Sequence, residues 1–222
     1  MYSWLTPYPT TLYKVEYTLT WWEDVQRILP PTVCTSSIQA VPGLKPNTLP
    51  IIIGVPFTEL SPTLAQEIQR CREPLILFLL VLYFPNSDIS HANALLINKE
   101  TREYERFDPM GTIPVPRIQR QQAKVDYWMT TTFRVYAGLE DYIYYPPEEV
   151  CPLVGPQPRS ERGIVTTGLC YQWSLLYLQT RSMYPYIQRD EILNLLLETP
   201  GDIIAKYAHY LHDKLGWPLI PP

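Results

Sequence analysis

The chain has 222 residues, of which 46% are hydrophobic and 18% are charged, so it is long and apolar enough to bury a core and is not disordered. A net charge of −4 without a clustered basic excess argues against nucleic acid as a partner. The four cysteines lie far apart and form no C-x-x-C pair, so we expect a reducing compartment, no zinc site and no disulfide framework. We also expect no cofactor.

The first 60 residues are punctuated by eight prolines. We predict one domain over residues 1–222, in which residues 1–60 form a proline-rich extension and residues 61–222 form the core. Within the extension, the pattern predicts a strand from Thr11 to Thr20, a helix from there to Leu29 and a short buried strand from Ile51 to Val55.

The core begins with a predicted helix from Ser61 to Arg70, which has proline in its first turn. Leu75 to Phe84 is the most apolar run of the chain and lies between two prolines. It is much shorter than the roughly 18 residues that a membrane helix needs, so we expect no membrane span. We interpret this run as a buried central strand.

The next two predicted strands form a hairpin, from His91 to Ile97 and from Arg102 to Asp108. A tight connection would pair Ile97 with Arg102 and would place His91 directly opposite Asp108. Directly opposed residues have Cβ atoms about 4.5 to 5.5 Å apart, so the carboxylate could orient the imidazole and stabilise its charge. A slip of one residue would send His91 to the other face of the sheet.

The second half of the chain is predicted to be mainly helical. The expected elements are a helix from Arg117 to Val135, a strand from Asp141 to Tyr145, a loop from Cys151 to Gly163, and helices from Cys170 to Met183, Tyr186 to Glu198 and Thr199 to Leu215. Apolar residues cover nearly the whole circumference of the Cys170 helix, which is typical of a helix that is buried on most sides.

Cys170 follows Gly168-Leu169 at the start of that helix, where unpaired backbone N–H groups and the helix dipole favour a thiolate. Taken singly, Cys170 fits core packing, His91 fits a structural role and Asp108 fits a turn. Together the three supply the nucleophile, base and orienting group of a thiol enzyme. Cys151 is either a second functional thiol or a filler.

Two further histidines lie in the last helix. His209 and His212 are three residues apart, but no third ligand cluster accompanies them, so we expect solvated positions and no metal site.

Five sequence blocks carry a resemblance to a known family. In chain order they are His91-Ala-Asn, Phe107-Asp-Pro-Met-Gly111, Cys151-Pro-Leu-Val-Gly-Pro-Gln157, Gly168-Leu-Cys-Tyr-Gln-Trp-Ser174 and Arg181-Ser-Met-Tyr-Pro185. This order resembles the adenovirus-proteinase and SUMO/ubiquitin-like-protease superfamily of papain-like cysteine peptidases. The blocks are most similar to those of uncharacterised proteins of large nucleocytoplasmic DNA viruses.

The resemblance implies an α+β fold of the papain-like type, with a mixed sheet packed against the Cys170 helix and the C-terminal helices. It implies Cys170 as nucleophile, His91 as base, Asp108 as its orienting acid and Gln157 as oxyanion donor. The family's glutamine normally lies only a few residues before the cysteine, and its SUMO and ubiquitin proteases usually have tryptophan where this chain has Ala92.

The implied function is that of a viral thiol peptidase, which cleaves a peptide or isopeptide bond in a viral precursor or a ubiquitin-like conjugate. The expected location is the virion or the host cytoplasm, and the expected partners are a protein substrate or capsid proteins. Two alternatives remain open: a minor capsid component that retains the protease fold, and an acetyltransferase on the same fold.

Overall fold

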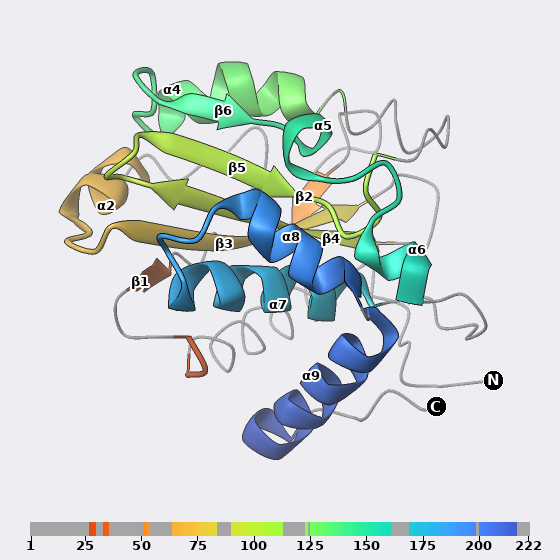
Figure 1. The fold of residues 1–222 in the computed structure, drawn as a ribbon. Coiled ribbons are helices and arrows are strands. Elements are labelled where there is room, and N and C mark those ends of the chain that lie inside the picture. Colours follow the sequence, from red (N-terminus) through yellow and green to blue (C-terminus); the bar gives the residue numbers. More distant parts are fainter. Residues whose placement is uncertain are drawn as a thin grey trace.

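The computed structural model describes residues 27–29, 33–35, 51–53, 64–83, 90–112, 123, 125–160, 169–198 and 200–216. The strand predicted from Thr11 to Thr20, most of the helix that follows it, and Gly168 lie outside these residues. The described part is a mixed β-sheet with helices on both faces (Figure 1). The predicted α+β fold, in which a mixed sheet packs against the Cys170 helix and the C-terminal helices, is therefore confirmed.

The sheet has six strands in the order β1-β3-β4-β5-β6, and β2 also pairs with β3. The strands are β1 (Val33–Thr35), β2 (Ile51–Ile53), β3 (Leu75–Tyr83), β4 (Ser90–Asn98), β5 (Glu103–Phe107) and β6 (Ile143–Tyr145). The β1–β3 and β5–β6 pairs are parallel, whereas β3 pairs with β2 and β4 in the antiparallel sense, as does β4 with β5.

Strand β3 is buried on both faces, as its continuous apolar run predicts. Leu75 and Leu77 belong to one core cluster, and Ile76, Phe78 and Leu80 belong to the other. Successive side chains of a strand point to opposite faces, so this alternation assigns one cluster to each side of the sheet.

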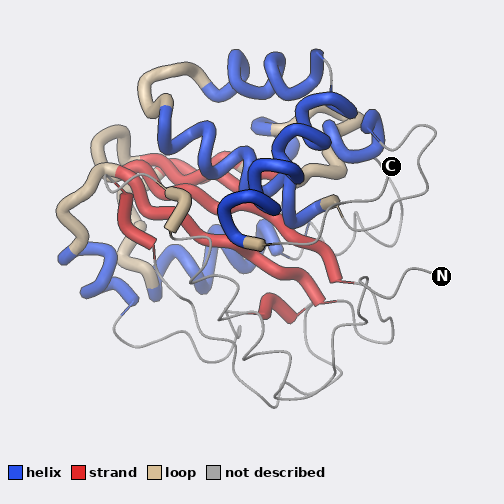
Figure 2. Tube along the Cα trace, turned by 90° about the horizontal axis from the view of Figure 1, so that it is seen from below, coloured by secondary structure: helices blue, strands red, loops and turns tan. Residues whose placement is uncertain are grey.

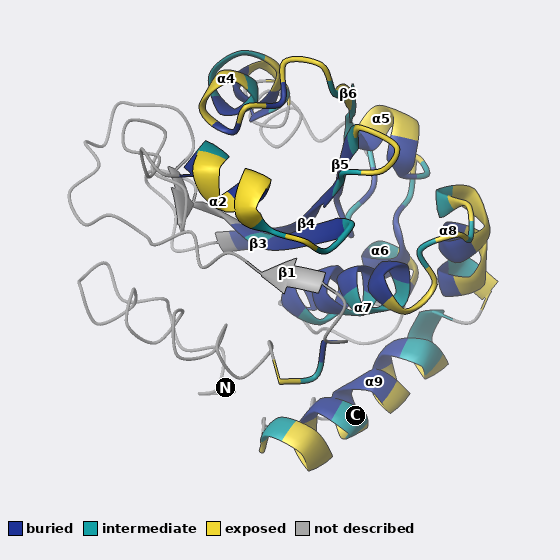
Figure 3. Ribbon diagram, turned by 90° about the vertical axis from the view of Figure 1, so that its left-hand side faces the viewer, coloured by how far each residue is buried: buried dark blue, intermediate teal, exposed yellow. Residues whose placement is uncertain are grey.

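One side is covered by α2 (Leu64–Arg70) and by a helical segment over residues 125–136, which includes the π-helical turn η1 (Met129–Phe133) and α4 (Arg134–Tyr136). On the other side α7 (Cys170–Met183) packs directly on the sheet, and α8 (Arg189–Glu198) and α9 (Pro200–Leu215) pack against α7 (Figures 2 and 3). No helix among the described residues is both long and apolar enough to cross a membrane.

Helix α7 lies across the sheet and is buried on most sides, as predicted. Trp173, Tyr177 and Leu178 are fully buried, and the Tyr177 ring stacks on Phe107 of β5 with centroids 4.2 Å apart. These large buried side chains fix the position of α7 between the sheet and α9.

The register of the β4–β5 hairpin differs from the prediction. Ile97 pairs with Tyr104 and not with Arg102, so His91 is not directly opposite Asp108. The loop has the predicted length but lies one residue further along. Asn98 stays in β4, and its side-chain oxygen accepts hydrogen bonds from the backbone N–H groups of Glu100 and Thr101. Arg102 takes a left-handed φ of 55°, which ends the loop.

Other sequence predictions are also corrected. Part of the expected 151–163 loop is helical, as α6 (Pro156–Ser160), and it follows a short helix α5 (Pro147–Val150). The strand expected from Asp141 begins at Ile143, and the helix expected from Tyr186 begins at Arg189. Cys71 is disulfide-bonded, although the cysteine spacing led us to expect no disulfide framework, whereas Cys151 and Cys170 are free.

We expect Leu77→Ala to lower the free energy of unfolding by about 2 to 5 kcal/mol, because Leu77 has no exposed surface and the substitution leaves a cavity beneath α7. Leu195→Ala, at a site with 52% exposure on α8, is the matched control and should cost less than about 1 kcal/mol. Urea unfolding of both variants measures the difference. Equal losses would contradict the assignment of Leu77 to the core.

Candidate active site

His91 and Asp108 form a hydrogen-bonded pair at one end of the hairpin. The distance from His91 Nε2 to Asp108 Oδ1 is 2.7 Å, and both residues are buried. Since Ala94 pairs with Phe107, Asp108 lies beside Asn93, two residues from His91 on the same face. The predicted contact is therefore made diagonally, because a register shift of two residues preserves the face on which a side chain lies.

The pair is charged at neutral pH. Burial lowers the pKa of His91, but the charge of Asp108, its hydrogen bond and a hydrogen bond with Cys170 outweigh this and raise the pKa to about 10. Burial likewise raises the pKa of Asp108, but the charge and hydrogen bond of His91, the charge of Arg106 and the Met110 N–H lower it below its usual range. An imidazolium thus faces a carboxylate.

Cys170 lies at the first position of α7 and is 3% exposed. It packs against Ala92, the residue after His91, and it lies near enough to the His91 side chain to help raise the pKa of that imidazole. The structure therefore brings together three of the four predicted site residues, Cys170, His91 and Asp108.

A second contact joins α7 to β4 at this point. The Ser174 hydroxyl, one turn after Cys170, donates a hydrogen bond to the Ala92 carbonyl oxygen over 3.1 Å. The first turn of α7 is thereby fastened to the strand that carries His91.

The N-terminal end of α7 also presents backbone donors. Trp173 N–H donates to the Leu169 carbonyl, so the amides that precede Trp173 make no hydrogen bond within the helix. Leu169 supplies no side-chain cap. Backbone N–H groups near Cys170, together with the helix dipole, favour negative charge at this end of α7.

The fourth predicted residue, Gln157, is buried in α6. Its backbone N–H donates to the Pro109 carbonyl over 3.0 Å, which places the start of α6 against the turn that carries Asp108. Helix α6 also contacts α7. Gln157 is thus near the His91–Asp108 pair even though it lies far from Cys170 in sequence.

Sequence reasoning missed a buried charged network beside Asp108. Arg106 has no exposed surface, and its guanidinium binds both carboxylate oxygens of Asp126 over 2.8 Å and the Asn93 side-chain oxygen over 2.5 Å. Tyr144 joins the same network. The sequence did show an arginine within a short strand, between Tyr104 and Phe107, which hinted at a buried charge. The carboxylate that binds it, however, is 20 residues away.

Cys151 is a buried thiol that packs beside Asp108. Its sulfur accepts a hydrogen bond from the Asp108 backbone N–H over 3.2 Å, and burial raises the thiol pKa well above its ordinary range. A neutral thiol is a poor nucleophile, so the structure favours the packing interpretation over a second functional thiol.

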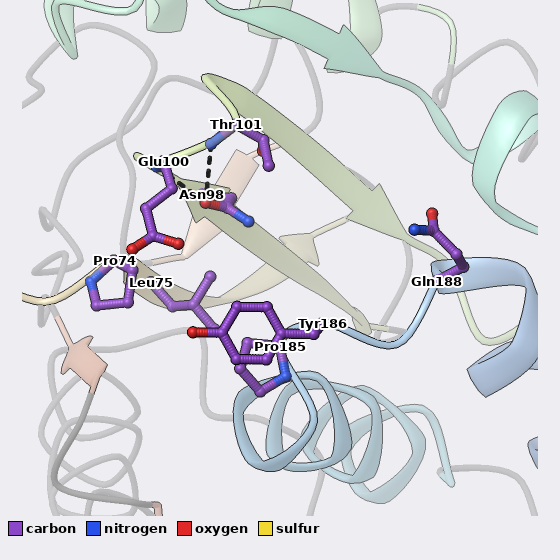
Figure 4. Close-up of a pocket in the computed structure, with 8 residues that line it drawn as sticks. All are labelled: Pro74, Leu75, Asn98, Glu100, Thr101, Pro185, Tyr186 and Gln188. Carbon is purple, nitrogen blue, oxygen red and sulfur yellow. Dashed lines mark hydrogen bonds between the residues drawn. The ribbon is translucent and has the colours of Figure 1, made fainter.

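Other candidate sites are separate from this one. A pocket of about 200 Å³ is lined by Leu75, Asn98 and Tyr186, among others (Figure 4). Leu75 pairs with Asn98 whereas His91 pairs with Leu82, so roughly 23 Å of strand separates the pocket from His91.

The two histidines of α9 are exposed, as expected. In the part of the chain that the structure describes, no group of three or more His, Cys, Asp or Glu residues could hold a metal ion.

A thiol at a helix N-terminus beside an imidazolium–carboxylate pair is an arrangement suited to acyl transfer through a covalent thioester. No protein-family model and no curated protein matches the chain. Three solved structures from Chlamydia trachomatis are similar to it. They are ChlaDub1 (13% identity over 67% of this chain and 66% of that chain, TM-score 0.40), the effector protein ChlaDUB1 (12%, 92% and 76%, 0.42) and the effector protein Cdu1 bound to ubiquitin (13%, 92% and 83%, 0.43).

The first of these alignments covers just under two thirds of the ChlaDub1 chain. Because all three TM-scores are low, the function proposed below rests on the geometry of the site.

We expect Asp108→Asn to destabilise the protein in a pH-dependent manner. The pKa of His91 is raised from 6.5 to about 10, so its pairing stabilises the fold fully below pH 6.5, and this contribution is lost as the pH rises through about 10. The wild type should therefore exceed Asp108→Asn in unfolding free energy at pH ~6, and the difference should vanish above pH ~10.

Denaturant unfolding across this pH range measures the difference. Asp141→Asn, which changes an exposed aspartate, is the control and should run parallel to the wild type. A gap between wild type and Asp108→Asn that does not depend on pH would contradict the charged pair.

Proposed function

We propose that the protein is a thiol peptidase that cleaves a peptide or isopeptide bond, with Cys170 as nucleophile, His91 as general acid and base, and Asp108 as the group that orients His91. The observation that carries this proposal is the 2.7 Å bond between His91 and Asp108, next to Cys170 at the start of α7, which packs on the residue after His91.

In the first step the Cys170 sulfur attacks the substrate carbonyl carbon as a thiolate, and the carbonyl oxygen takes up the negative charge. The helix N-terminus and the Cys170 backbone N–H are suited to stabilise that oxygen. Gln157, buried near the Asp108 turn, would add a side-chain amide donor.

The tetrahedral intermediate then collapses. The C–N bond breaks, the His91 imidazolium gives its proton to the leaving amine, and a thioester to Cys170 remains. Neutral His91 next takes a proton from water, the resulting hydroxide attacks the thioester carbonyl, and Cys170 leaves as thiolate. Asp108 stabilises the imidazolium whenever it is present and keeps the ring in the same orientation throughout.

The enclosure of the site bears on substrate entry. Cys170 is 3% exposed and His91 is 8% exposed, so a carbonyl group can reach the sulfur only after neighbouring groups move. The same enclosure lowers the local dielectric constant and so strengthens the imidazolium–carboxylate interaction.

The bond cleaved would belong to a protein, either a viral precursor or a ubiquitin-like conjugate. Location in a virion or in the host cytoplasm, capsid partners, the absence of nucleic-acid binding, a minor capsid role and acetyltransferase activity stay predictions from the sequence.

We expect electrophilic thiol probes to label the protein at Cys170 alone. Two probes with the same electrophile, one carried on ubiquitin and one on a short peptide, distinguish a macromolecular substrate from a simple peptide. Mass spectrometry locates the adduct. Cys170→Ala should lower the labelling rate by at least about 10³-fold, as expected for loss of a nucleophile. Undiminished labelling of Cys170→Ala would refute the proposal.

We expect Gln157→Ala to lower kcat by about 10²-fold with little change in KM, because an oxyanion donor acts mainly in the transition state. Gln188→Ala, a change at an exposed position in the α7–α8 connection, is the matched control. Steady-state kinetics on the substrate that the probes identify measures both. An increase in KM alone would place Gln157 in substrate binding and not in oxyanion stabilisation.

A further inference from the structure

The turn that carries Asp108 is held along one side by residues 151–157, which we call the 151–157 segment. Four hydrogen bonds join the two, with lengths from 3.0 to 3.2 Å: Asp108 N–H to Cys151 Sγ, Gln157 N–H to Pro109 O, Gly155 N–H to Met110 O and Thr112 N–H to Pro152 O. The segment is therefore hydrogen-bonded to the turn at four points, although the two lie about 40 positions apart in sequence.

Two glycines allow this close approach. A Cβ on Gly155 would collide with the backbone of Pro109 and Gly111, and a Cβ on Gly111 would collide with the backbone of Gly155 and Pro152. Gly111 also has a φ of +78°, a conformation that side-chain-bearing residues rarely adopt. The turn and the 151–157 segment are thus in direct backbone contact.

The chemistry of Cys151 suits its position next to Asp108. The thiol is buried and neutral, so its sulfur accepts the Asp108 N–H without placing a second negative charge beside the carboxylate. The backbone N–H, which is buried at this point, would otherwise lack this acceptor, at a cost that buried donors generally incur.

The orientation of the carboxylate is set by the backbone of the same turn. Asp108 Oδ1 accepts both His91 Nε2 at 2.7 Å and the Met110 N–H at 2.9 Å. A shift of the turn therefore moves the carboxylate oxygen that holds the imidazole. Charge-assisted hydrogen bonds weaken as they lengthen or bend, so the His91 contact is sensitive to this shift.

We propose that Cys151 and Gly155 are positioning residues, through which the 151–157 segment fixes the Asp108 carboxylate toward His91. The catalytic consequence rests on the proposed peptidase function, whereas the positioning itself does not. The segment thus does more than bring Gln157 near the site, and Cys151 serves the reaction without contacting the substrate.

The test follows the imidazole of His91 by NMR in a Cys170→Ala background, where Asp108 is the remaining partner that holds the His91 proton. Cys151→Ala should lower the His91 titration midpoint by about half a unit to one unit, the equivalent of one hydrogen bond. Cys151→Ser, whose hydroxyl can accept the same N–H, should retain most of the midpoint. The exposed His209 and His212 serve as internal references in the same spectra. An unchanged His91 midpoint in Cys151→Ala would overturn the proposal.

A second pair of variants separates positioning from general destabilisation. Gly155→Ala forces the segment away from Pro109 and should lower the His91 midpoint. Gly138→Ala is the matched control, because Gly138 has a φ of +67° and lies beside Ala65 of α2, away from Asp108. It should lower Tm and leave the His91 midpoint unchanged. Equal effects of both variants on the midpoint would overturn the proposal, and if Gly155→Ala does not fold, the Cys151 variants decide the question.

Labelling of Cys170 by the electrophilic probe separates this proposal from the proposed function. In otherwise wild-type protein, Cys151→Ala should slow labelling by about 3- to 10-fold. A lowered His91 midpoint with no labelling of wild-type Cys170 would support positioning and refute the peptidase. Rapid labelling of wild type and Cys151→Ala alike, with an unchanged midpoint, would refute positioning and leave the peptidase supported.

Discussion

The contact between α7 and β4 at Ala92 governs the geometry of the whole site. Cys170 packs on the Ala92 side chain, and Ser174 holds the Ala92 carbonyl. A side chain larger than alanine at this fully buried position would have to displace α7, and with it the sulfur.

The other end of the helix is held at Glu105, which accepts hydrogen bonds from Tyr177 and Arg181 over 2.7 and 2.9 Å. Fixing both ends limits sliding of the helix along the sheet.

Buried charge extends this constraint to both sides of the sheet. Glu105 and Arg106 are neighbours in β5, so their side chains point to opposite faces, and each finds an opposite charge on the helices that cover that face: Arg181 on α7 and Asp126 on the 125–136 segment. Removing one partner of such a pair costs about 3 to 5 kcal/mol, because the other charge stays buried. Arg106 also helps to keep Asp108 ionised.

The sequence predicted the elements whose signal is local, and it missed those that depend on distant partners. The apolar run of β3 and the apolar circumference of α7 both follow from periodicity, and the chemistry of Cys170, His91 and Asp108 suggested their association. The register depended on Asn98 and Arg102, whose turn conformations shift the loop by one residue. The Arg106–Asp126 pair and the contact of Cys151 with Asp108 join segments separated by 20 and 43 positions, for which no local pattern exists.

His91 and Asp108 are in contact although they are not directly opposite. Their contact therefore depends on whether a register shift is by an even or an odd number of residues, and not on one exact register. Alternation along a strand means that a hairpin shifted by an even number of residues still presents both side chains to one face, whereas an odd shift separates them by the thickness of the sheet. The loop after Asn98 can therefore change length by two residues and keep the imidazole facing the carboxylate side. A change there that slips the register by one residue would separate the pair.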